Sequence, residues 1–131
     1  MSHLLLDTDV WSFLFKGDTR AENFRSHLVG NTPCIAFATV AELYLWAELH
    51  NWGSRRQESL RQAMAGHLIL SYDDATGRQW ARIRAERQRL GKPMASQDAW
   101  IAACAIRHGM ALLTHNSAHF ENITGLSLLT A

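Results

Sequence analysis

Four acidic residues stand where the predicted strands end or the predicted helices begin. Asp7 and Asp9 directly follow three consecutive leucines, and such an apolar run predicts a short buried strand. Glu42 and Asp98 each lie near the start of a later predicted helix. In open parallel sheets, ligands bind in the crevice beyond the carboxyl ends of the strands. The sequence therefore predicts that these carboxylates share one crevice.

Carboxylates that share a crevice repel one another unless a cation lies among them. Oxygen ligands with additional water suit Mg²⁺ or Mn²⁺. Such an ion can generate hydroxide and stabilise in-line attack on a phosphodiester. The chain has seven histidines, but His115 and His119 follow a predicted strand and lack a third soft ligand nearby, so a zinc site is not predicted.

Each acid also has a structural interpretation that remains open at this point. Asp7 or Asp9 could cap the helix that follows. Thr39 and Glu42 have the spacing of a capping box, with the threonine at the N-cap. Asp98 would be stabilised by the helix dipole, behind an N-cap at Ser96.

A polar loop follows the fourth predicted strand at the same edge. It contains Thr114, His115 and Asn116. Because the strand before it is predicted to run parallel to the first, we expect this loop to reach the crevice as well.

Strand and helix patterns alternate along the whole chain. The predicted strands span 4–6, 34–37, 68–72, 110–114 and 126–129, and the predicted helices span 10–15, 20–28, 39–47, 55–66, 74–90 and 96–108. This alternation predicts an α/β fold, a three-layer α/β/α sandwich with a mostly parallel central sheet. The length of 131 residues suits a single domain over residues 1–131.

The composition is that of a globular protein, with 47% hydrophobic and 19% charged residues. The net charge is +1, so binding to nucleic acid needs a local basic face. Arg78, Arg82 and Arg89 share one side of the predicted helix 74–90. That side is either a solvated face or a ridge that follows phosphates.

The cellular location is predicted from what the sequence lacks. Two cysteines in apolar runs indicate buried side chains in a reducing compartment. We find no signal-peptide pattern and no apolar run long enough to span a bilayer. These features predict a cytoplasmic protein without membrane contact.

Four motifs, in order along the chain, resemble those of a known family. They are Leu5-Leu6-Asp7-Thr8-Asp9-Val10, Thr39-Val40-Ala41-Glu42-Leu43, Gln97-Asp98-Ala99-Trp100-Ile101-Ala102-Ala103, and Leu113-Thr114-His115-Asn116 before Phe120. The sequence resembles PIN-domain ribonucleases of the VapC toxin type. The resemblance implies a Mg²⁺-dependent endoribonuclease, a hydrolase that cleaves transfer or ribosomal RNA. It also implies a homodimeric toxin of a type II toxin–antitoxin system, silenced by a cognate antitoxin.

The resemblance also implies roles for individual residues. Asp7 and Asp98 would be the main metal ligands, Glu42 a further acid, and Asn116 the polar residue of the last motif. Ser96 and Thr114 would be supporting hydroxyls.

The chain departs from the family pattern at three positions. Asp9 stands where such sequences often have asparagine, and Asn116 and His119 stand where many members carry an acid. Asp9 or a water molecule could replace the fourth acidic group.

Three alternative functions deserve comparison. Asp7 and Asp9 also fit the nucleophile motif of haloacid-dehalogenase-like phosphatases, which needs a lysine and a late acidic pair. A phospho-receiver domain would use Asp73 or Asp74 and a lysine after the last strand. The only lysines are Lys16 and Lys92, so both alternatives lack required residues. A catalytically weak PIN-like module that only binds RNA or protein is the third.

Overall fold

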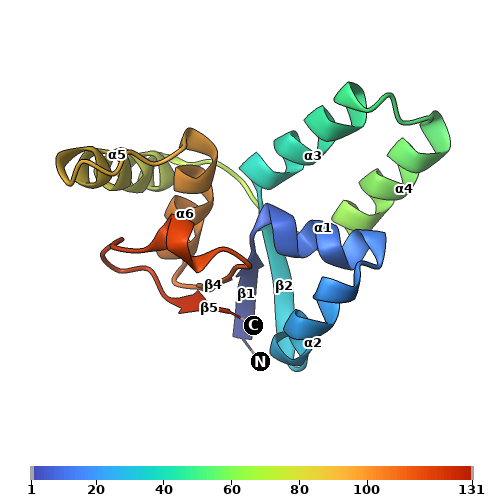
Figure 1. The fold of residues 1–131 in the computed structure, drawn as a ribbon, viewed down its shortest axis with the longest axis horizontal. Helices are drawn as coiled ribbons and strands as arrows, with labels where there is room; N and C mark the ends of the chain where they lie inside the picture. The colour runs from blue at the N-terminus through green and yellow to red at the C-terminus, as the bar shows by residue number, and fades with distance from the viewer. Residues whose placement is uncertain (1, 131) are drawn as a thin grey trace.

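A five-stranded sheet, with every strand parallel to its neighbours, lies at the centre of the protein (Figure 1). The structure is a computed structural model that describes residues 2–130. The strands are β1 (Ser2–Leu6), β2 (Asn31–Ala36), β3 (Leu68–Leu70), β4 (Ala111–Leu113) and β5 (Leu128–Leu129). Their order is β3-β2-β1-β4-β5, which places β1 in the middle. Residues that follow β1 therefore emerge at the centre of the sheet edge.

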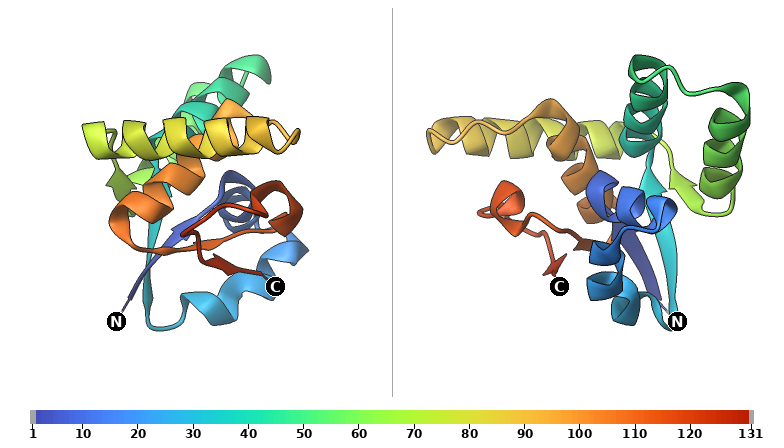
Figure 2. Two further views of the ribbon diagram at one scale, coloured as in Figure 1. Left: turned by 90° about the vertical axis from the view of Figure 1, so that its left-hand side faces the viewer. Right: turned by 45° about the vertical axis from the view of Figure 1, so that its right-hand side comes forward.

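Helices cover both faces of the sheet and diverge from it as two separate groups (Figures 1 and 2). One group comprises α1 (Thr8–Lys16), η1 (Thr19–Ala21), α2 (Glu22–Leu28), α3 (Phe37–Leu49) and α4 (Ser54–Ala65). The other comprises α5 (Asp74–Arg89), α6 (Ser96–His108) and the short 3₁₀ helix η2 (Ser117–Phe120). The predicted three-layer α/β/α sandwich is confirmed, and its sheet is wholly parallel.

The two layers of core packing follow from the alternation of side chains along β1. Leu5 packs in the core on the α5–α6 side, together with the small side chains of α6. Leu4 and Leu6 pack in the core on the other side, against α1 to α4. Successive residues of a strand point to opposite faces, so a run of three leucines serves both cores.

Two predicted helix caps are wrong. Helix α3 begins at Phe37 because Ala36 is its N-cap, so Thr39 lies inside the first turn and cannot form a capping box with Glu42. Thr39 is instead buried, with its hydroxyl 3.0 Å from the hydroxyl of Thr8. Helix α6 begins at Ser96, its N-cap is Ala95, and no side chain caps it.

The spacing of the apolar residues in α5 predicts one buried face that includes Ile83 and Leu90, and the structure differs from it at the end of the helix. Ile83 is buried, but Leu90 is 58% exposed because the helix ends at Arg89. Arg87, one turn earlier, is only 9% exposed. A charged residue thus occupies a core position of this helix.

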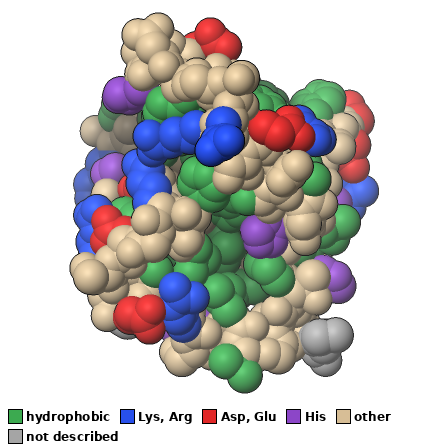
Figure 3. Space-filling model, turned by 90° about the vertical axis from the view of Figure 1, so that its right-hand side faces the viewer, with side chains coloured by type: hydrophobic (Ala, Val, Ile, Leu, Met, Phe, Trp, Pro, Cys, Tyr) green, Lys and Arg blue, Asp and Glu red, His purple; other side chains and the backbone are tan. Residues whose placement is uncertain are grey.

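The face made by α1 and α4 carries an apolar hollow, visible among the hydrophobic side chains in Figure 3. It is lined by Trp11, Leu14, Phe15, Ala63 and His67. Within residues 2–130, we find no helix with the length and apolar run needed to cross a membrane.

The middle strand supplies the first stability prediction. Leu5→Ala removes a side chain with 0% exposure, and we expect a loss of about 2–5 kcal/mol in the free energy of unfolding. Leu68→Ala, on the edge strand with 48% exposure, should cost less than about 1 kcal/mol. Urea denaturation of both variants measures the difference, and equal losses would contradict the central position of β1.

Candidate active site

The predicted acids meet in one pocket of about 140 Å³ beyond the carboxyl ends of β1 and β4. Its lining includes Asp7, Asp9, Glu42, Asp98 and Asn116. Three separate elements, the β1–α1 junction, α3 and α6, deliver the acids, and the loop after β4 delivers the amide. The sequence therefore predicted which residues come together.

Asp7 is both a helix cap and a buried acid of the pocket. The residue is only 5% exposed, and one of its carboxylate oxygens accepts a 2.8 Å hydrogen bond from the backbone amide of Val10. The other oxygen accepts a 2.5 Å hydrogen bond from the hydroxyl of Thr114. Burial raises the pKa of Asp7, these two hydrogen bonds oppose the rise, and the nearby charge of Asp9 adds to it. The two interpretations of Asp7 are thus compatible.

Asp98 lines the same pocket from the first turn of α6. Burial raises its pKa, the charge of Asp9 adds to the rise, and His119 opposes it. The Nδ1 atom of His119 lies 3.5 Å from a carboxylate oxygen of Asp98. The folded protein therefore holds Asp98 in a setting that disfavours its negative charge.

Glu42 is positioned by a residue that sequence reasoning did not single out. The side-chain amide of Gln97 donates a 2.5 Å hydrogen bond to the carbonyl of Ala38 and lies 3.4 Å from Oε1 of Glu42. Gln97 thus ties α6 to the first turns of α3. The available signal in the sequence was that Gln97, whose side-chain amide can donate hydrogen bonds, directly precedes Asp98.

The loop after β4 forms the remaining wall of the pocket. The hydroxyl of Thr114 donates to Asp7 and accepts a 3.0 Å hydrogen bond from the amide N–H of Asn116. The side-chain nitrogen of Asn116 lies 3.1 Å from Nε2 of His119. The amide of Asn116 and the imidazole of His119 therefore line the pocket at the two positions where many family members carry an acid.

Other predicted site residues lie outside this pocket. Ser96 is exposed at the start of α6, where its carbonyl accepts from the indole of Trp80. Arg78 forms an ion pair with Asp74, and Arg82 bonds to Gln79, Glu86 and the carbonyl of Thr124. Arg89 is exposed at the end of α5. Two of the three arginines thus already have partners within the protein.

The donor set fits a hard cation better than a soft one. Carboxylate, hydroxyl and amide oxygens line the pocket, and no cysteine does. Among residues 2–130, no three histidine, cysteine or acidic side chains form a preassembled metal-binding group. A site without three preassembled ligands is compatible with Mg²⁺, because this ion is commonly held by one or two carboxylates and keeps several of its waters.

The setting of Asp98 leads to a prediction about stability and pH. Because its pKa is higher in the folded protein, its charged form costs stability, and that cost grows as pH rises above the ordinary value of 3.8. In metal-free buffer, Asp98→Asn should therefore raise the melting temperature by a few degrees at pH 7. At pH 3 it should leave the melting temperature unchanged.

The matched control is Asp74→Asn, which changes another first-turn acid, on α5, that is paired with Arg78. It should leave the melting temperature unchanged or slightly lower at pH 7. Thermal unfolding across the pH range measures both variants, and a lower melting temperature for Asp98→Asn at pH 7 would refute the prediction.

Comparison with known proteins agrees with this geometry. A family model described as the PIN domain matches residues 4–126. The tRNA(fMet)-specific endonuclease VapC of Shigella flexneri is 30% identical over 126 residues, which cover 96% of each chain. A crystal structure of DNA-bound VapBC from Salmonella typhimurium matches with a TM-score of 0.82 and 29% identity, over 99% of this chain and 98% of that chain.

VapBC2 from Rickettsia felis, in a structure with a promoter DNA fragment, matches with a TM-score of 0.83, over 98% of each chain. At 22% identity, this second structure shows the likeness of fold alone. The family model spans nearly the whole chain, and the acids of its motifs meet in one pocket. The chain therefore belongs to the PIN-domain family, among its VapC-type members.

Proposed function

We propose that this protein is a Mg²⁺-dependent endoribonuclease and the toxin of a type II toxin–antitoxin pair. The observation that carries the proposal is the meeting of Asp7, Glu42 and Asp98 in one pocket of a PIN-domain chain. The names of its relatives describe those proteins as an endonuclease and a ribonuclease. Mn²⁺ is the alternative ion.

Asp7 and Asp98 are the proposed metal ligands, because they reach the pocket from separate elements, the end of β1 and the first turn of α6, and are the acids whose pKa burial raises. A bound Mg²⁺ would supply a Lewis acid and a water of lowered pKa. Thr114 holds the Asp7 carboxylate through its hydroxyl, which leaves the remaining lone pairs of that carboxylate for the pocket. Glu42 lies in the second turn of α3 and is contacted by the side-chain amide of Gln97. It is placed to orient or deprotonate a water.

We propose transfer or ribosomal RNA as the substrate. One relative is named a tRNA(fMet)-specific endonuclease, which supports the first of these. Sequencing RNA ends after induction of the protein in cells identifies the target, and scattered cuts in messenger RNA alone would refute both.

The proposed partner is a cognate antitoxin. Solved relatives include VapBC assemblies and a toxin–antitoxin complex from Klebsiella pneumoniae. A homodimer is also proposed, on the family resemblance, and light scattering of the purified protein tests it. Co-expression with the protein encoded next to it should relieve toxicity.

The first functional prediction concerns the acids. Asp7→Asn and Asp98→Asn should abolish RNA cleavage with Mg²⁺ present, and Glu42→Gln should reduce it by about 10²–10⁴-fold. Glu42→Gln should keep its melting temperature, because Glu42 has no capping role. Asp74→Asn is the control and should cleave at the wild-type rate.

Cleavage that persists in Asp7→Asn and Asp98→Asn would refute the assignment of metal ligands. If the wild-type protein binds RNA but cuts none with any divalent ion, the chain is the PIN-like binding module that we consider the alternative. The phosphatase alternative is excluded by membership of the PIN-domain family.

The second functional prediction concerns the missing fourth acid. Asn116 has the same reach as aspartate but carries no charge, so Asn116→Asp should lower the Mg²⁺ concentration for half-maximal cleavage. Asp9→Asn removes a charge from the same pocket and should raise that concentration. Altering His119 should change it little, because imidazole is a poor ligand for Mg²⁺. An unchanged value in both variants would show that neither residue acts on the metal.

A further inference from the structure

Arg87 is a buried cation without an acidic partner. Its Nε donates a 2.9 Å hydrogen bond to the carbonyl of Lys92, and its Nη1 donates to the carbonyls of His119 and Glu121 at 3.3 and 3.2 Å. Among residues 2–130, no carboxylate lies within ion-pairing distance of its guanidinium. A buried charge is costly unless an opposite charge compensates it. Arg87 therefore has no direct ion pair, and the acid that its charge influences is Asp98, which lines the same cavity and whose pKa the charge of Arg87 lowers.

One edge of the Arg87 guanidinium remains available. Two of its three nitrogens donate to carbonyls, and the third, Nη2, makes no hydrogen bond to another described residue. No buried side-chain nitrogen or oxygen in the described part of the chain lacks a partner, so Nη2 must retain contact with solvent. This arrangement presents a charged donor to the space beside it.

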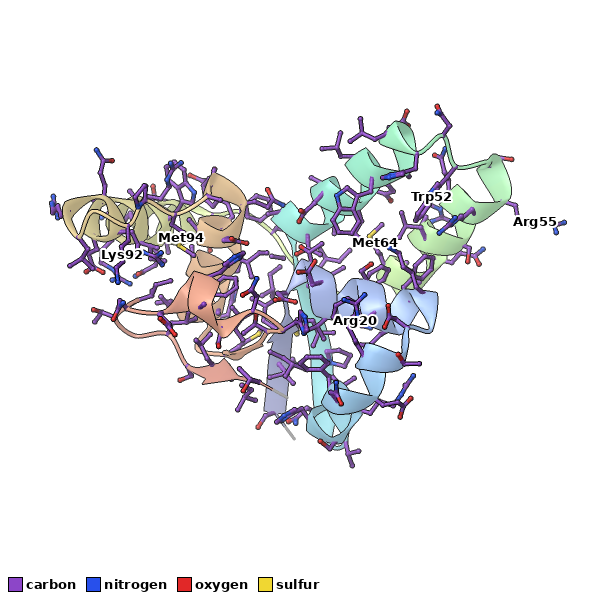
Figure 4. The ribbon with its side chains drawn as sticks, viewed as in Figure 1. Arg20, Trp52, Arg55, Met64, Lys92 and Met94 are labelled. Atoms are coloured by element: carbon purple, nitrogen blue, oxygen red, sulfur yellow. The ribbon has the colours of Figure 1, made fainter. Side chains whose placement is uncertain are left out.

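That space is a cavity of about 230 Å³, which we call the Arg87 cavity. It is lined by Arg87, Pro93, Met94, Ala95, Asp98, Ala118 and His119. Lys92 and Met94, labelled in Figure 4, mark the segment between α5 and α6 that borders it. The cavity is several times larger than the roughly 30 Å³ that one water molecule occupies.

The start of α6 adds a second positive feature at the same place. Ala95, which lines the cavity, is the N-cap of this 13-residue helix, and no side chain caps it. The first N–H groups of a helix have no partner within the helix, and its dipole makes this end positive. Uncapped helix N-termini are established sites for phosphate groups.

The Arg87 cavity adjoins the acid pocket, because Asp98 and His119 line both. We infer that the Arg87 cavity binds a backbone phosphate of the RNA next to the bond that is cleaved. Arginine suits this role because its planar fork matches phosphate oxygens. The inference rests on the proposed ribonuclease function and adds a subsite to it.

Direct replacement of Arg87 is a poor first test, because its bonds to the carbonyls of His119 and Glu121 also hold η2 and the residue after it. The rim offers a cleaner change. Ala118 is exposed and lines the cavity, so Ala118→Glu places a negative charge there without removing a contact. Ala118→Gln is the matched control, with nearly the same size and no charge.

The measurement is the affinity for a fluorescent single-stranded RNA, in Mg²⁺, with both changes made in an Asp7→Asn protein that should not cut it. Ala118→Glu should weaken binding at least about tenfold, and Ala118→Gln less than about twofold. Equal affinity of the two variants would overturn the subsite while leaving RNA binding in place. Failure of both the Asp7→Asn protein and the wild-type protein in metal-free buffer to bind RNA would overturn both the subsite and the proposed function.

Arg87→Lys provides a second test, because it keeps the charge but loses the fork. If its circular dichroism matches the wild type, we expect KM for RNA to rise about tenfold with kcat nearly unchanged, since the flanking phosphate positions the substrate. Arg61→Gln on α4, which lines neither pocket, is the control and should leave KM unchanged. A folded Arg87→Lys protein with wild-type KM would count against the subsite.

Discussion

The structure depends on the burial of one carboxylate at the end of its central strand. Asp7 takes a hydrogen bond from α1 through Val10 and another from the end of β4 through Thr114. These contacts fix the direction of α1 and the position of the polar loop together. The same burial disfavours the negative charge of Asp7, so the fold holds this acid where a cation would stabilise it. Structural and chemical roles are thus carried by one side chain.

The features that the sequence predicted well are those with strong local signals. Short apolar runs placed the strands, and acids directly after them placed the crevice, because parallel strands must end at a common edge. Helix starts were less certain. Thr39 has the right spacing for a cap, but α3 begins two residues before it, after the N-cap Ala36, so Thr39 lies inside the first turn and is buried against Thr8. Long-range contacts of this kind leave no local pattern.

Other parts of the site depend on contacts between distant segments. Gln97 reaches Ala38 across 59 residues, and Arg87 reaches the carbonyl of Glu121 across 34. The helical-face pattern assigned Arg78, Arg82 and Arg89 to solvent or RNA and left out Arg87. The structure shows that Arg82 is bound to Glu86 and to the carbonyl of Thr124, and that Arg87 is buried. Burial of a single arginine depends on the neighbouring loop, which periodicity does not describe.

The middle position of β1 has a consequence for the order in which this protein is made. β1 is synthesised first, but its neighbour β4 and the hydroxyl of Thr114 follow more than a hundred residues later. A nascent chain that ends before α6 has Asp7 and Glu42 but neither Asp98 nor the loop that closes the pocket. The complete acid pocket therefore forms only after the segment from α6 to η2 has left the ribosome, so a copy that stops before α6 lacks the site.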